Sequence, residues 1–251
     1  MPRAQDRLPV TLRETLDAQT EAWNSRALLR RLYREWFEEI GRRLATVPGD
    51  TVELGSGTGR LKEQVPFVVT TDVEPTPWAD HVVDAERLPF ADGSLANLVL
   101  IDVFHHLADP AGFLDEARRT LAPGGRVVIL DPYCSPVSTL AYRAFHPERT
   151  DLSAPAFAPE AEIAADPLAS NQARATLVFF RHRAELRRGW PDLRVVERRR
   201  LALVAYPLSG GFFGRRLAPG AAYRPLAAAE RVLAPLAPLL AFRCLVVLER
   251  A

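Results

Sequence analysis

Apolar residues recur along the chain with two spacings, which predict helices and strands. Aliphatic and aromatic residues stand at every fourth position, with arginine and glutamate on the opposite face, at Leu28, Leu32, Trp36, Ile40 and Leu44. This spacing predicts an amphipathic helix that ends before Pro48-Gly49-Asp50. Short runs rich in aliphatic residues then follow at 51–54, 67–71, 81–83, 95–102 and 126–130. Their length and composition predict strands.

The segments between and after these strands predict the rest of an α/β fold. Residues 109–121 carry their apolar side chains at helical spacing, which indicates a crossover helix between parallel strands. Six prolines interrupt residues 131–190, so we expect short helices and loops inserted there. Residues 193–206 and 242–249 then predict two closing strands, separated by a helix at 226–240. The sequence therefore predicts a seven-stranded, mostly parallel sheet.

Three glycines follow the first predicted strand at alternate positions, Gly55, Gly57 and Gly59. Glycine adopts positive φ readily and has no Cβ, so this turn allows a ligand to approach the main chain closely. Arg60 occupies the place where a dinucleotide-binding turn carries its third glycine, which argues against a nicotinamide cofactor. A tight strand-to-helix turn that binds nothing remains the structural alternative.

Two acidic residues follow the next predicted strands. Asp72 is placed to accept hydrogen bonds from both hydroxyls of a ribose, or else it is a solvated turn residue. Asp84 is placed to accept a hydrogen bond from an adenine amino group, or else it caps a helix.

An ordered set of motifs resembles the class I S-adenosylmethionine-dependent methyltransferases, in particular the type 11 methyltransferase domain. The set consists of E-L-G-S-G-T-G at 53–59, T-D-V at 71–73, D-A-E-R-L-P-F at 84–90, D-V-F-H-H-L at 102–107 and R-T-L-A-P-G-G-R-V-V-I-L-D-P at 119–132. The resemblance implies a Rossmann-like α/β fold with helices on both faces of the sheet. It also implies S-adenosyl-L-methionine as cofactor and S-adenosyl-L-homocysteine as product.

The same resemblance assigns roles to individual residues. Gly55, Gly57 and Gly59 would line the methionine and ribose parts of the cofactor, Glu53 would support its amino group, and Asp72 would hold the ribose. The adenine would lie beside Val73, with Asp84 and Ala85 at its edge. Ser56 and Asp102 complete the implied cofactor-binding set, which is Glu53, Gly55, Ser56, Gly57, Gly59, Asp72, Val73, Asp84, Ala85 and Asp102.

We divide the chain according to these patterns. Residues 1–50 form an N-terminal helical cap, 51–132 the cofactor-binding core, 133–190 an inserted cap of helices and loops, and 191–251 the closing strands of the same domain.

Histidines supply the candidate catalytic groups. His105 and His106 follow the fourth predicted strand at the carboxyl edge, where α/β sheets bind ligands, and a neutral imidazole there can accept a proton from the acceptor. His146, in the inserted cap, is a third candidate. The segment 206–214 mixes aromatic residues and glycines, which suits a lid or an apolar wall.

Composition limits the kinds of binding partner and the cellular location that we expect. The formal net charge of +1 argues against a nucleic-acid surface, so a small-molecule acceptor is expected. Two isolated cysteines suggest neither a disulfide framework nor a metal site, and residues 1–19 lack the apolar core of a signal peptide. No run is long enough to span a membrane, so a cytoplasmic protein is expected. The pattern does not predict an oligomeric state.

The prediction is a methyltransferase that acts on a small-molecule, lipid-precursor or sugar-containing acceptor. A methyltransferase-like binding subunit without turnover and, less favoured, a nicotinamide-dependent oxidoreductase are the alternatives.

Overall fold

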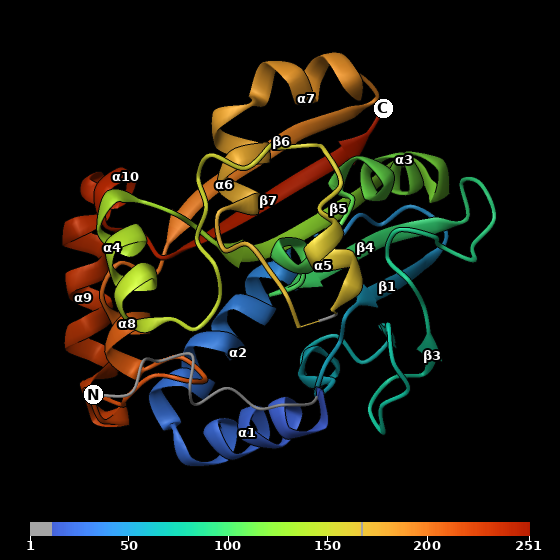
Figure 1. Cartoon of the computed structure of the whole chain (residues 1–251). Coiled ribbons are helices and arrows are strands. Elements are labelled where there is room, and N and C mark those ends of the chain that lie inside the picture. The colour runs from blue at the N-terminus through green and yellow to red at the C-terminus, as the bar shows by residue number, and fades with distance from the viewer. Residues whose placement is uncertain (1–11, 167) are drawn as a thin grey trace.

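The computed structural model describes residues 12–166 and 168–251, which form a seven-stranded sheet between layers of helices (Figure 1). The strands are β1 Asp50–Leu54, β2 Val69–Asp72, β3 His81–Val82, β4 Leu95–Ile101, β5 Leu121–Pro132, β6 Leu193–Leu201 and β7 Arg243–Arg250. Their order is β3-β2-β1-β4-β5-β7-β6, and only β7 is antiparallel to its neighbours. The predicted seven-stranded, mostly parallel fold is confirmed.

Helices cover the sheet and form the cap. The α-helices are α1 Leu12–Ser25, α2 Ala27–Gly41, α3 Pro110–Thr120, α4 Pro136–Phe145, α5 Ala161–Ala165, α6 Arg174–Thr176, α7 Arg183–Gly189, α8 Ala205–Ser209, α9 Tyr223–Leu233 and α10 Ala237–Leu240. Short 3-10 turns occur at Arg60–Glu63, Phe104–His106, Gly220–Ala222 and Ala234–Leu236, and a π-helical turn occurs at Leu177–Arg181. None of the helices in the described ranges has both the length and the apolar composition needed to cross a bilayer.

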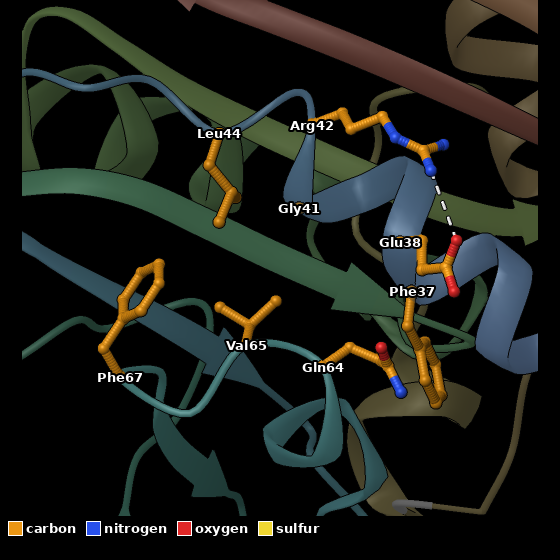
Figure 2. A pocket seen from close by; sticks show the side chains of 8 residues that line it. All are labelled: Phe37, Glu38, Gly41, Arg42, Leu44, Gln64, Val65 and Phe67. Carbon is orange, nitrogen blue, oxygen red and sulfur yellow. Dashed lines mark hydrogen bonds and ion pairs between the residues drawn. The ribbon is translucent and has the colours of Figure 1, made fainter.

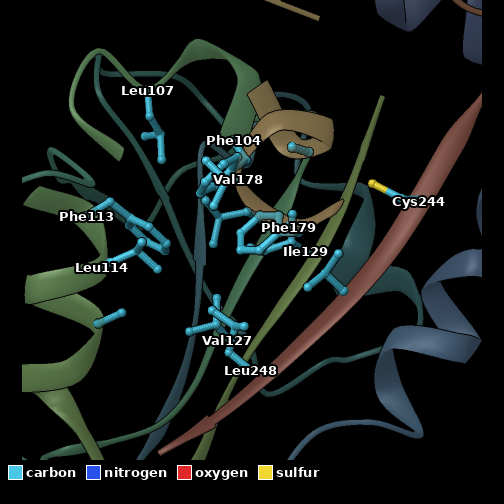
Figure 3. Close-up of a cluster of buried hydrophobic side chains, with 14 of the residues drawn as sticks. Phe104, Leu107, Phe113, Leu114, Val127, Ile129, Val178, Phe179, Cys244 and Leu248 are labelled. Atoms are coloured by element: carbon cyan, nitrogen blue, oxygen red, sulfur yellow. The ribbon is translucent and has the colours of Figure 1, made fainter. Parts of the chain in front are cut away.

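Alternating side chains on the central strands supply two cores. Along β5, Val127 and Ile129 face one side of the sheet and pack with α3 and the cap (Figure 3). Val128 and Leu130 face the opposite side and pack with α2. Side chains of a strand point alternately to either face, so these fully buried aliphatic runs require helices on both faces of the sheet.

The predicted strand 193–206 is too long, because β6 ends at Leu201. Ala202 adopts a left-handed φ of 63°, and α8 begins at Ala205. The Glu230 carboxylate, from α9, accepts the backbone N–H groups of residues 203–205 at 2.8–2.9 Å. This contact comes from a distant part of the chain and gives those N–H groups partners outside a strand.

One predicted helix also differs, and the helical segment after the glycines is short. The segment after the glycines forms only one 3-10 turn, Arg60–Glu63, since Pro66 closely follows it and restricts the preceding residue. The predicted helix 226–240 begins earlier, at Tyr223, and is divided into α9, a 3-10 turn and α10. Pro235 and Pro238 lie in the second and third of these pieces and cannot donate backbone hydrogen bonds.

Candidate cofactor and acceptor site

The glycine turn lies at the carboxyl end of β1, between β2 and β4. Gly55 and Gly57 have φ values of 66° and 51°, in the region that disfavours other residues. A Cβ at Gly55 would stand 2.5 Å from a methyl carbon of Val103, whereas a Cβ at Gly57 would meet nothing closer than 3.6 Å, the Leu16 side chain of α1. A Cβ at Gly57 would therefore make ordinary van der Waals contact with α1, whose Gln19 side chain is also 3.7 Å away, so α1 lies beside this turn.

Asp72 joins the end of β2 to this turn. Its Oδ2 accepts the Gly57 N–H at 2.9 Å, and its Oδ1 accepts the Val73 N–H at 2.9 Å. Burial raises the pKa of the Asp72 carboxyl, although these N–H donors oppose the shift. The structure thus brings Asp72 and Gly57 together, while the Val73 side chain is 49% exposed beside them.

Four buried polar atoms in the turn or on neighbouring elements have no hydrogen-bond partner among the described residues: Thr20 Oγ1 of α1, Glu53 Oε2 of β1, Ser56 Oγ of the turn and Arg60 Nε directly after it. Burial and the neighbouring Asp72 charge raise the pKa of Glu53 to about 8. Buried polar atoms are normally paired, so these atoms are available to pair with polar groups of a ligand. A carboxyl group and two hydroxyls suit the amino-acid end of S-adenosylmethionine, and the donor set therefore fits that cofactor.

Asp84, the second acidic candidate, directly follows a residue that contacts Asp72. The Val83 N–H donates to the Asp72 main-chain oxygen at 2.8 Å, which places Asp84 and Ala85 near the same strand edge. Asp84 is exposed, and its Oδ1 accepts the Glu86 N–H at 2.8 Å. Asp84 therefore caps a turn in this structure.

Asp102 follows β4 with a left-handed φ of 58°. Its carboxylate accepts a hydrogen bond from the Tyr33 hydroxyl at 2.6 Å and pairs with Arg243, which is buried. Tyr33 comes from α2 and Arg243 from β7, so the sequence pattern contained no signal for either partner. These contacts hold the aspartate at the carboxyl edge of the sheet, with its side chain 27% exposed.

His105 lies between two carboxylates. Its Nδ1 is 2.9 Å from Asp131 Oδ1, at the end of β5, and its Nε2 is 3.2 Å from Glu148 Oε2, in the cap. Burial alone would lower the pKa of His105, but the two carboxylates outweigh it and raise this pKa to about 10. The ring is therefore a buried imidazolium whose two N–H groups are both engaged. Sequence reasoning missed Asp131 and Glu148 as partners.

His106 has the opposite electrostatic character. Burial and the charged His105, whose ring centroid is 4.2 Å away, lower its pKa to about 4. Its Nδ1 is 3.0 Å from the Ala169 main-chain oxygen. A carbonyl oxygen only accepts, so Nδ1 carries the proton and Nε2 has a free lone pair. His106 is a neutral imidazole with a basic nitrogen.

His146 joins this cluster from the C-cap of α4. Its Nδ1 accepts the Glu148 N–H at 3.3 Å, so the proton of the neutral ring lies on Nε2. Burial lowers the pKa of His146. Its ring contacts Tyr142 and Phe213, with centroids 5.7 and 6.4 Å away. The three predicted histidines therefore gather at one place, with three different proton arrangements.

Ligand-type atoms of His105, His106 and Glu148 all lie within 4.8 Å of one another. Glu148 also accepts hydrogen bonds from Ser170 and Gln172, and neighbouring positive charge holds its pKa well below the usual value despite burial. Hydrogen bonds within the protein therefore account for this arrangement.

A separate surface hollow of about 400 Å³ lies between the end of α2 and the loop before β2 (Figure 2). Its lining includes Phe37, Val65 and Phe67, and its Glu38 is paired with Arg42. This hollow faces the amino ends of the parallel strands, away from the glycine turn and the histidines.

The comparisons with known proteins agree with this geometry. Residues 52–129 match the family model described as a methyltransferase domain. A stretch of 49 residues is 49% identical to an uncharacterised protein in transposon TN4556 of Streptomyces fradiae, and covers 20% of this chain and 14% of that protein's length.

Solved structures are similar over most of the chain. A complex of the Haloferax volcanii Trm112 methyltransferase activator with a putative methyltransferase gives a TM-score of 0.50 at 19% identity, covering 96% of this chain and 97% of the other. Geranyl diphosphate C-methyltransferase from Streptomyces coelicolor, solved with Mg²⁺, a substrate analogue and S-adenosyl-L-homocysteine, gives 0.50 at 15% identity, with coverages of 88% and 77%. At these identities the likeness establishes the fold. Together, the family match and the shared fold identify residues 52–129 as a methyltransferase domain within a class I methyltransferase fold, as predicted.

Proposed function

We propose that the protein transfers a methyl group from S-adenosylmethionine to a small-molecule, lipid-precursor or sugar-containing acceptor. The observation that carries this proposal is the pair of unpartnered buried oxygens on Glu53 and Ser56, at the glycine turn that contains Gly57. When bound, the cofactor supplies an electrophilic methyl group on a sulfonium and leaves as S-adenosylhomocysteine. Glu53 would hold its amino group, Asp72 its ribose, and Val73, Asp84 and Ala85 its adenine.

His106 is the residue that we propose as general base. Of the three candidate histidines, His105 has both nitrogens engaged with carboxylates, and His146 uses its lone pair at Nδ1 on a backbone N–H. Only His106 of these three keeps an unprotonated nitrogen for the acceptor. His105 acts as a positioning residue, because its positive charge keeps His106 neutral and its ion pairs join β5 to the cap.

The surroundings of His106 and His146 support an acceptor with an apolar part. Tyr142, Phe213 and Tyr206 lie around this end of the site, from α4, the 210–214 loop and α8. Tyr206 also contacts Tyr33 of α2, with ring centroids 6.5 Å apart. Helices from both ends of the chain therefore enclose the acceptor side, which suits exclusion of water during transfer. Both cysteines are free, which supports the cytoplasmic location that we include in this proposal.

Calorimetry with three ligands tests the cofactor assignment. We expect S-adenosylmethionine and S-adenosylhomocysteine to bind in the micromolar range, about −8 kcal/mol, and NAD not to bind. Binding of NAD alone would favour the oxidoreductase, and binding without methyl transfer to any acceptor in cell extracts would favour a binding subunit.

Single-turnover kinetics, once an acceptor is found, test the base. His106→Ala is expected to keep cofactor affinity and to lose roughly a hundredfold in rate, the usual effect of a general base. The rate of the wild type should fall as the pH drops through about 4, since His106 is then protonated. His146→Ala is the matched control, because its lone pair is already used. A larger loss in the control than in His106→Ala would assign the base to His146.

A further inference from the structure

An apolar face lies on the helices that flank the acceptor side. By the apolar face we mean the exposed apolar side chains on these neighbouring elements: Val137, Leu140 and Phe145 of α4 and Val232, Leu236 and Leu239 of the segment 223–240. Three of them are more than 70% exposed: Leu140 at 71%, Val232 at 78% and Phe145 at 80%. α4 packs beside α10, and both lie with α9 at one side of the molecule (Figure 1). Clusters of exposed apolar residues of this size mark interaction surfaces.

The apolar face is flanked by positive charge. Arg143 on α4 and Arg224 and Arg231 on α9 are exposed. Glu230 is the one acidic residue in the segments 136–145 and 220–242. Its carboxylate is occupied by three backbone N–H groups of the α8 turn, as described above. The outer surface of these helices thus presents aliphatic side chains and arginines without accessible carboxylates.

The exposed aliphatic side chains and the arginines together favour one kind of binding partner. In a symmetric dimer the same patch would face itself, so the arginines of one copy would meet those of the other without acidic partners. An anionic lipid surface instead supplies negative headgroups for the arginines and an apolar layer for the leucines. We propose that the protein docks peripherally on anionic membranes through the apolar face of α4, α9 and α10.

The docking face adjoins the acceptor site. Tyr142 belongs to α4, and His146 is the residue at its C-cap. The inward side of α4 therefore faces the proposed acceptor site, where buried Tyr142 contacts His146, while Leu140 on the same helix is exposed. An acceptor held in the membrane would reach the histidines along the end of this helix. This inference concerns where the protein binds and does not depend on the proposed methyl transfer.

Co-sedimentation with lipid vesicles tests the proposal. We expect the full chain to bind vesicles that contain phosphatidylglycerol and to bind pure phosphatidylcholine at least tenfold more weakly. Binding should weaken between about 0.1 M and about 1 M salt, because the Debye length falls from about 10 to about 3 Å. Absence of binding to both vesicle types, or equal binding to the two, would overturn the proposal.

Paired variants locate the surface. Leu140→Asp combined with Leu236→Asp is expected to reduce vesicle binding at least tenfold. Phe67→Asp combined with Val82→Asp changes equally exposed apolar residues near the opposite edge of the sheet and should leave binding unchanged. Circular dichroism confirms that both double variants fold. Equal effects of the two pairs would overturn the location, and sedimentation equilibrium showing dimers that Leu140→Asp dissociates would assign the face to a second copy.

Charge removal provides an independent arm. Replacing Arg143, Arg224 and Arg231 with glutamine should weaken binding about fivefold for each arginine, as expected for cations near an anionic bilayer. The same replacement of Arg34, Arg42 and Arg118 removes equal charge elsewhere, from surface ion pairs of α2, its C-cap and α3. Equal losses in both triple variants would show that net charge alone drives adsorption, against a specific face.

Discussion

The glycine turn and the histidine cluster satisfy their polar groups in different ways. At the turn, Glu53 and Ser56 carry buried oxygens without partners. In the cluster, His105 pairs with Asp131 and Glu148, and the groups left without a hydrogen-bond partner among the described residues include His106 Nε2 and Asp131 Oδ2. Unpaired buried groups are costly, and a ligand that pairs them recovers that cost as affinity. Changes at the turn should therefore alter binding, whereas changes in the cluster should alter stability and catalysis.

The largest expected effect is on stability, from Asp131→Ala. This change leaves the buried His105 cation with one partner, and breaking a buried pair typically costs about 3–5 kcal/mol. Since the pKa of folded His105 is raised to about 10, its contribution is present below the ordinary histidine pKa and is lost as the pH rises toward 10. Urea unfolding across this range should show that the free energy of unfolding of the wild type decreases with pH, and that the decrease is smaller in the variant. Asp92→Ala, an 80% exposed acid, is the control and should cost less than about 1 kcal/mol.

The next effect is on cofactor binding, from Gly57→Val. The left-handed backbone costs a non-glycine residue about 1–2 kcal/mol, and the branched side chain would extend beyond the Cβ position, which Leu16 and Gln19 of α1 already contact. We expect affinity for S-adenosylhomocysteine to fall about 100-fold by calorimetry. Gly93→Val, with a similar φ of 64° far from the turn, should show the strain without the loss of affinity. Unchanged affinity in a folded Gly57 variant would contradict the placement.

Asp72→Ala should have an intermediate effect on affinity. Loss of hydrogen bonds to a charged acceptor typically costs about 1.5–3 kcal/mol. Asp84→Asn should cost less, because an amide keeps one acceptor and the native carboxylate is exposed. If both variants bound the cofactor like the wild type, the two acids would be turn residues only.

The smallest effect at neutral pH is expected from Glu53→Gln. At pH 9 this change should weaken cofactor binding but stabilise the ligand-free protein. The pKa of about 8 leaves Glu53 largely protonated at pH 7, so cofactor affinity of the wild type should rise as the pH increases through 8 and the carboxylate forms. The cofactor affinity of the variant should not rise with pH, so the variant should bind the cofactor more weakly than the wild type at pH 9. Without ligand, it should unfold at higher urea than the wild type at pH 9, since no buried charge develops. Calorimetric measurements of cofactor affinity and urea unfolding, both repeated across the pH range, check the two expectations.

Local patterns predicted most of the core. The glycines at 55, 57 and 59 predict the positive φ values found there. The aliphatic runs of β1, β4 and β5 predict buried parallel strands. The strand predicted at 193–206 was too long because a distant residue decided the conformation. Strand β6 ends early because Glu230 binds the backbone of residues 203–205, and no window around Leu201 contains that information.

By itself, the sequence determined the order of strands and helices, the glycine turn and the acids that follow the strands, because each depends on neighbouring residues. Only the tertiary structure decided which histidine keeps a free basic nitrogen. His105, His106 and His146 are the same residue type, and their protonation depends on Asp131, Glu148 and the Ala169 carbonyl, which arrive from separate elements. Proton positions follow from charges and hydrogen-bond partners in space, and folding alone brings those groups within reach of the rings.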